Sequence, residues 1–90
     1  MARVIITIKV MPESLETNLE EITEKVKEEI TAYGGEVGKE ETEPVAFGLN
    51  AKKIIFILDE SKGVEELEKK LLNIKGVSSA DIIDVRRQFG

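Results

Sequence analysis

Residues 53–58 read Lys53-Ile54-Ile55-Phe56-Ile57-Leu58, a run that is apolar after its first residue and rich in β-branched side chains. The run is too short for a typical helix, and the polar segment 59–63 ends it abruptly. Such a run is typical of a central strand of a sheet. We expect this strand to be covered on both faces.

Three further strands are predicted around this run. Residues 3–10 place apolar side chains at alternate positions, the period of a strand with one face in a core. Residues 36–46 are mostly polar, as in an edge strand whose charges discourage pairing with other chains. A last strand is expected from about Val77 to Arg87.

Two amphipathic helices are predicted between the strands. In the first, apolar residues recur at three- and four-residue spacing from Leu15 to Tyr33, with Ser14 as the expected N-cap and Gly34-Gly35 as the end. The second extends from Val64 to Ile74, and Gly76 stops it.

The order of these elements predicts one α+β domain over residues 1–90. It is the ferredoxin-like split βαβ arrangement, in which two helices pack on one face of a four-stranded antiparallel sheet. Right-handed crossovers place the first and third strands at the centre of the sheet. Ile5, Ile55 and Ile57 are then expected to point away from the helices, where a chain terminus or another subunit would cover them.

The composition excludes several classes of site and partner. The chain has no cysteine and no histidine, which removes disulfides, thiolate chemistry and imidazole ligands. A net charge of -5 disfavours phosphate backbones and anionic lipid, and no stretch approaches the roughly 20 apolar residues of a membrane span. We therefore expect no direct nucleic-acid partner and no membrane partner. The first residues lack the apolar core of a secretory signal, so a cytoplasmic protein is expected.

Glu40, Glu41 and Glu43 supply the oxygen ligands that hard cations favour. Alternate residues of a strand face opposite ways, however, so only part of this cluster would converge on one ion. We interpret the segment as a solvated edge, and we assign no metal and no cofactor.

Two features call for a function. The loop Pro44-Val45-Ala46-Phe47-Gly48-Leu49 is unusually apolar for a turn between strands. Either Phe47 packs under the edge of the sheet or it docks on another molecule, and composition leaves both interpretations open. The second feature is Arg86-Arg87, a compact positive site on an acidic chain that is followed by residues 88–90.

With these features the chain resembles a known family, the archaeal translation elongation factor 1-beta. The resemblance rests on Val10-Met11-Pro12, on residues 44–49 followed by the strand 54–58, and on the motifs Gly76-Val77-Ser78-Ser79 and Asp84-Val85-Arg86-Arg87. It implies a translation factor that promotes exchange of GDP for GTP on elongation factor 1-alpha. Exchange needs no covalent chemistry, so no enzyme is implied. The expected partner is this GTPase, and a monomer is expected when the protein is free.

The resemblance also implies roles for particular residues. Phe47 matches the loop phenylalanine that docks on the partner in the eukaryotic relatives, and Gly48 and Leu49 beside it are expected to share the contact. Asn50 departs from the basic residue that relatives commonly carry there, so Lys52 is the expected partner-binding cation, with Lys53 as the other candidate. Aligning the last strands brings Arg87 close to the position of a lysine that, in those relatives, reaches toward the magnesium and phosphate site of the partner. The Arg86-Arg87 end is therefore expected to act on the nucleotide of the GTPase. Arginine keeps the positive charge of that lysine but is a larger planar group.

The alternative function is a ferredoxin-like ligand-binding or oligomerisation module. Such a module would use the open face of the sheet to associate and would close the loop over a small molecule. An acylphosphatase-like enzyme is the third candidate, because this fold can hold phosphate. It ranks last because the N-terminal region lacks the Gly-rich loop and the arginine that this activity uses.

Overall fold

The computed structural model describes residues 2–88, so Met1, Phe89 and Gly90 lie outside the described residues. Strands and helices follow one another in the order that the sequence predicts. Their bounds are β1 Arg3–Pro12, α1 Leu19–Ala32, β2 Glu36–Pro44, β3 Asn50–Asp59, α2 Val64–Leu72 and β4 Val77–Gln88, with a short 3-10 turn η1 at Ala46–Gly48. Neither helix of this described part is long and apolar enough to cross a membrane.

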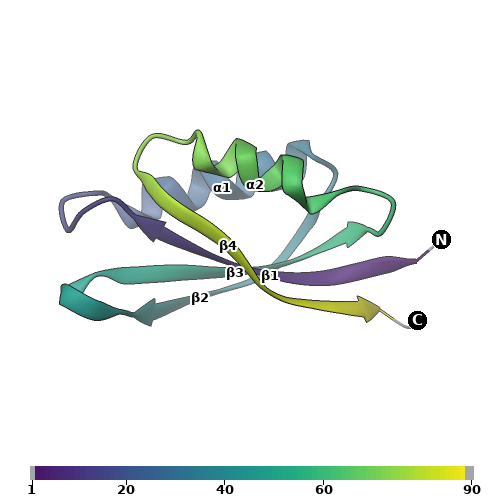
Figure 1. Ribbon diagram of the computed structural model, residues 1–90, viewed down its shortest axis with the longest axis horizontal. Coiled ribbons are helices and arrows are strands. Elements are labelled where there is room, and N and C mark those ends of the chain that lie inside the picture. The colour runs from purple at the N-terminus through teal and green to yellow at the C-terminus, as the bar shows by residue number, and fades with distance from the viewer. Residues whose placement is uncertain (1, 89–90) are drawn as a thin grey trace.

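The four strands form one antiparallel sheet in the order β2-β3-β1-β4. Both helices lie on one face of the sheet and leave the other face open (Figure 1). The two central strands are β1 and β3, as the crossover rule predicts. The ferredoxin-like fold is therefore confirmed.

The core lies between the helices and the face of the sheet that they cover. Strands contribute alternate residues to it, and each helix contributes one apolar stripe. The buried members of the core are Ile6, Ile8, Val10, Ile22, Val26, Ile30, Ile54, Phe56, Leu58, Leu67, Leu71, Val77 and Ala80. The predicted second helix ends earlier than expected, at Leu72, but Ile74 still packs against this core.

Within residues 2–88 only one face of β3 is covered, whereas the apolar run predicts cover on both faces. Ile54 and Phe56 are buried under the helices, whereas Ile55 and Ile57 face the open side and remain partly exposed. Ile5 of β1 lies opposite Ile57 in the register, so it shares the open face, as expected. The apolar run thus reflects a strand at the centre of a sheet that the described residues cover with one layer of helices.

The first helix begins later than predicted. Its N-cap is Asn18, whose Oδ1 accepts the backbone N–H of Glu21 at 3.1 Å. Ser14 instead shapes the turn before the helix, because its hydroxyl accepts the backbone N–H of Glu16 at 3.3 Å. Leu15 is consequently not part of the helical stripe, and its side chain is 70% exposed.

Candidate functional site

Phe47 is the most exposed large apolar side chain among residues 2–88, with 91% of its surface accessible. It lies in η1, the turn that connects the edge strand β2 to the central strand β3. The interpretation in which Phe47 packs under the edge of the sheet is therefore wrong. Full burial of such a side chain would contribute about 1.5–3 kcal/mol to folding, so folding does not favour this exposure.

The backbone of Phe47 is strained as well. Its φ of 62° and ψ of 27° lie in the left-handed region, and the following Gly48 has a φ of 76°. The backbone N–H of Leu49 donates to the carbonyl of Ala46 at 3.3 Å and closes the turn. Two successive positive φ angles are characteristic of a type I′ hairpin turn, which favours Asn-Gly. Phenylalanine at the first of these positions costs about 1–2 kcal/mol.

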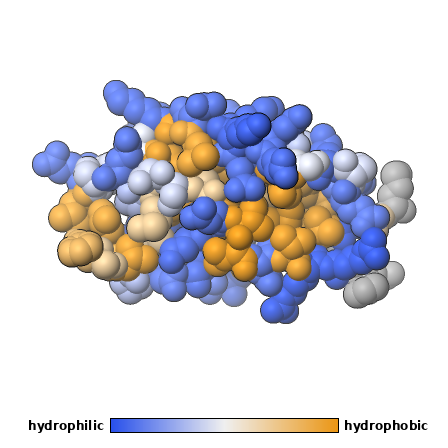
Figure 2. Space-filling model, in the orientation of Figure 1, coloured by the Kyte–Doolittle hydropathy of each residue, from blue (hydrophilic) through white to orange (hydrophobic). Residues whose placement is uncertain are grey.

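Leu15 lies beside this turn, although it belongs to the loop before α1. A Cβ atom placed on Gly48 would lie 3.6 Å from Leu15 Cδ2. Leu15 and Leu49 also line one small hollow of about 80 Å³ between the two loops. We call Leu15, Phe47 and Leu49 the apolar tip. Figure 2 shows hydrophobic residues gathered at the end of the molecule where these two loops lie in Figure 1.

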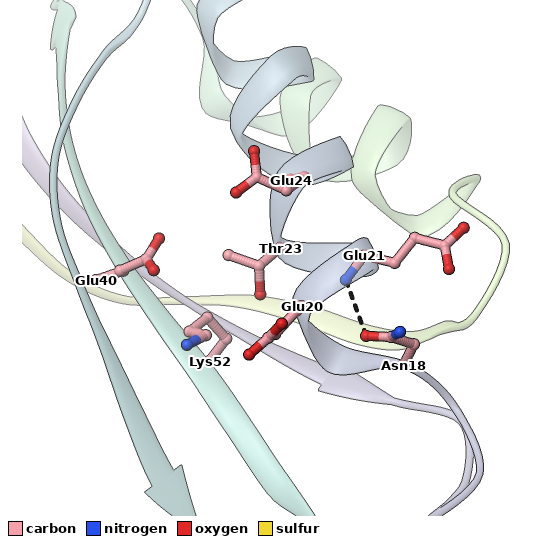
Figure 3. Close-up of a pocket in the computed structure, with 7 residues that line it drawn as sticks. All are labelled: Asn18, Glu20, Glu21, Thr23, Glu24, Glu40 and Lys52. Atoms are coloured by element: carbon pink, nitrogen blue, oxygen red, sulfur yellow. Dashed lines mark hydrogen bonds between the residues drawn. The ribbon is translucent and has the colours of Figure 1, made fainter.

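Lys52 lies outside the apolar tip, in a polar environment. It lines a polar groove of about 420 Å³ between α1, β2 and β3, together with Glu20, Glu24 and Glu40 (Figure 3). Its Nζ donates to Thr42 Oγ1 at 2.8 Å. The lining is rich in carboxylates, unlike the mostly apolar pockets that bind small ligands. The groove therefore lacks the apolar lining of a typical small-ligand site.

The acidic segment of β2 is divided between the two faces of the sheet. Glu40 pairs with Lys27 of α1 at 3.0 Å, on the side of the helices. Glu43 pairs instead with Lys9 at 3.4 Å and Lys53 at 3.5 Å, on the open side. Strand alternation thus separates these carboxylates. Within residues 2–88, no cluster of three or more acidic side chains is placed to hold a metal ion.

Arg86 and Arg87 lie near the end of β4, and each is held by a carboxylate. Arg86 Nε is 2.9 Å from Asp84 Oδ2, and Arg87 Nη2 is 2.7 Å from Glu60 Oε2 in the loop after β3. The hydrogen bond from Arg87 to Glu60 raises the pKa of the guanidinium above its already high value. Both side chains remain more than half exposed, at 76% and 59%, so their charges face solvent.

The structure does not bring the arginines to the apolar tip. In the sheet register Lys52, near the tip, pairs with Val10, whereas Arg87 pairs with Val4. Val10 and Val4 are six residues apart on β1, which corresponds to roughly 20 Å at about 3.3 Å per residue. The longest dimension of the molecule is 42 Å. The two groups of predicted site residues therefore lie near opposite ends of the sheet.

Sequence comparison identifies the family. The EF-1 guanine nucleotide exchange domain matches residues 5–87, a range that contains the apolar tip and both arginines. The chain belongs to this family. Its function is accordingly guanine nucleotide exchange in translation elongation. The resemblance inferred from the motifs is confirmed.

Individual relatives agree with this assignment over nearly their whole length. Elongation factor 1-beta of Methanothermobacter thermautotrophicus is 41% identical over 88 residues, which cover 97% of this chain and 98% of the relative. The Staphylothermus marinus protein of the same name is 38% identical, with 97% and 98% covered. That of Thermofilum pendens is 33% identical over 92 residues and covers both chains fully.

Solved structures support the fold alone. The ACT domain from GTP pyrophosphokinase of Chlorobium tepidum superimposes with a TM-score of 0.63 at 14% identity, covering 88% of this chain and 96% of that domain. The C-terminal domain of the MgtC protein from Mycobacterium tuberculosis also gives a TM-score of 0.63, at 9% identity, covering 98% of this chain and 88% of that chain. Such low identities carry no functional inference.

Leu15 is the member of the apolar tip that the sequence did not reveal. Its spacing to Leu19 and Ile22 fits a helical stripe, so periodicity assigns it to the core. The capping pattern, in contrast, favours a later start of the helix. Asn18 followed by Glu21 is a possible capping box one turn later, and a helix that begins there leaves Leu15 in the loop.

Proposed function

We propose that this protein accelerates GDP release from elongation factor 1-alpha by docking on the GTPase through the apolar tip and acting near the nucleotide through Arg86 and Arg87. The observation that carries this proposal is Phe47, which is both strained and 91% exposed. Both features are unfavourable for the free chain. Both are expected of an aromatic anchor that is buried only when a partner binds.

The proposed mechanism needs no covalent step. An exchange factor binds the nucleotide-free GTPase more tightly than the GDP-bound form, and by linkage the same coupling free energy lowers the affinity of the GTPase for GDP. Arg87 would contribute positive charge near the partner's magnesium and phosphate site. Its ion pair with Glu60 holds the side chain at the end of the sheet until the partner competes for it.

The roles of the docking loop differ among its residues. Phe47 and Leu49 supply apolar contact, and Gly48 provides the second left-handed residue of the turn. Lys52 is proposed to contribute charge from the adjacent groove rather than from the tip itself. We further propose that residues 1–90 act as one exchange domain, that the free protein is a cytoplasmic monomer, and that it contacts neither nucleic acid nor membrane directly.

Stopped-flow release of a fluorescent GDP analogue from elongation factor 1-alpha tests the proposal. Release should accelerate as this protein is added and should saturate when the complex is fully formed. An unchanged release rate, with both proteins folded, would overturn the proposed function. A measurement of solution mass distinguishes the oligomerisation alternative, which requires a stable dimer that does not affect the GTPase.

A further inference from the structure

One partner that contacts both the apolar tip and Arg87 must extend along a side of the domain between them. The two groups lie near opposite ends of the sheet, and β4 is one of the two edge strands, with β2, that run from one end to the other (Figure 1). Strand β4 begins beside Pro12, where the loop of Leu15 starts, and it ends with Arg86 and Arg87. The surface along β4 is thus continuous with both parts of the proposed docking site.

The edge of β4 exposes large apolar side chains. Ile83 is 47% exposed and Val85 is 54% exposed, and together we call them the β4 edge patch. Figure 2 shows hydrophobic residues over the second half of β4, on the same face as the hydrophobic end of the molecule. Among the described strands, β1 alone pairs with β4, which leaves the outer edge of β4 unpaired in this part of the chain.

A β-bulge positions Ile83. In the register Thr7 pairs with Asp84 and Ile8 pairs with Ile82, so Ile83 is the extra residue between them. Ile82 packs against the core, while the extra residue breaks the alternation and leaves its side chain at the surface. Bulges of this kind often redirect a side chain beside a functional site.

The opposite edge of the sheet offers a different surface. Between the ends of β2, the exposed residues are Gly38, Lys39, Glu40, Glu41 and Thr42. The open face carries Ile5, Ile55 and Ile57, but these are only partly exposed, and ion pairs such as Arg3–Glu36 and Lys9–Glu43 lie around them. Of these surfaces, the β4 edge has the apolar side chains that the central part of an interface requires.

We infer that the β4 edge patch is the middle of the surface that binds the GTPase, with Ile83 and Val85 packing on an apolar strip of the partner. This inference rests on the proposed function and adds binding residues to it. The apolar tip anchors one end of the partner, the β4 edge patch contacts its centre, and Arg87 reaches the nucleotide region at the other end.

A double variant, Ile83→Thr with Val85→Thr, tests the inference. Threonine keeps the β-branch that a strand favours and removes apolar contact. Because both side chains are about half exposed, thermal stability should change little. The dissociation constant of the complex with elongation factor 1-alpha, measured by titration calorimetry, should rise about tenfold, the loss expected when interface residues are truncated. The matched control is Lys39→Thr with Glu41→Thr on the β2 edge, which leaves the net charge unchanged and should bind like the parent.

The outcomes separate this inference from the proposed function. If Phe47→Ala weakens the complex and the double threonine variant does not, the β4 edge patch is not part of the interface, although the proposed function stands. A parent protein that leaves GDP release unchanged overturns the proposed function itself. If the parent is a dimer that the double variant converts to a monomer with unchanged GTPase affinity, the patch binds a second copy of this chain and the inference is wrong.

Discussion

Arg87 donates from Nη2 to Glu60 Oε2 across 2.7 Å, which ties the end of β4 to the loop after β3. Asp59, the last residue of β3, lies directly opposite Arg3, the first residue of β1, at the same end of the sheet. The start of β1, the end of β4 and the loop after β3 therefore lie together in one charged region. The ion pair between Arg87 and Glu60 is exposed and contributes little to stability. Its consequence is positional, because it holds a cation at a defined place far from the apolar tip.

Arg87→Ala should slow GDP release more than it weakens binding. The proposed role of the guanidinium is to act near the nucleotide, whereas the grip comes from the apolar tip. The rate at saturating exchange factor should therefore fall while the dissociation constant changes little, as measured by stopped-flow fluorescence and calorimetry. Arg3→Ala removes another exposed arginine from the same end of the sheet and serves as the control. A loss of affinity that accounts for the whole loss of rate would contradict this role.

Phe47→Ala should weaken the complex by about 2 kcal/mol or more, the loss that defines an interface hot spot. The corresponding increase in dissociation constant is about thirtyfold. The fold should be retained, because the ring is 91% exposed and makes no contribution to the core. Circular dichroism checks the fold and calorimetry measures the affinity. Unchanged affinity in a folded variant would remove Phe47 from the interface.

Phe47→Asn should stabilise the free protein while it impairs exchange. Asparagine tolerates the left-handed conformation that Phe47 adopts at φ 62° and would complete an Asn-Gly turn with Gly48. Relief of strain should raise the free energy of unfolding by about 1 kcal/mol. Urea denaturation measures the gain, and GDP release measures the loss. A variant that is less stable than the parent would show that the turn is not strained by its phenylalanine.

Stability should decrease in acid partly through Glu43. Burial raises the pKa of Glu43, but the ammonium groups of Lys53 and Lys9 outweigh this effect and hold the pKa below its usual 4.5. Because the pKa in the folded state is the lower one, the unfolded state binds the proton first as the pH falls. The stabilisation is therefore complete above the unfolded pKa and is lost as the pH falls through the folded pKa.

Urea midpoints measured between about pH 5 and pH 3 test this dependence. Glu43→Gln should make the midpoint fall less steeply in this range than it does in the parent, while Glu41→Gln on the same strand should not. Some acid dependence should remain, because hydrogen bonds from Ser61 also lower the pKa of Asp59. Parallel curves for the parent and Glu43→Gln would exclude a contribution from this cluster.

Local sequence patterns were sufficient to predict the elements of the fold and their order. Alternation in residues 3–10 and the helical stripes report which side of each element is buried, and these patterns act over a few residues. The start of α1 was misplaced, because spacing does not distinguish Leu15 in a loop from Leu15 on a helix, whereas the Asn18 cap does. The described residues cover one face of β3 rather than the predicted two, because the layers around a strand come from distant parts of the chain.

The chain itself contains the apolar turn, the two arginines and the family motifs, since each of these is written in neighbouring residues. Their relative positions depend on long-range strand pairing. Antiparallel pairing of β1 with both β3 and β4 brings the loop of Leu15 to the turn of Phe47 and places Arg87 at the far end. The bulge in the same ladder exposes Ile83 between them. No local pattern encodes such distances, because they arise from hydrogen bonds between residues that are remote in the sequence.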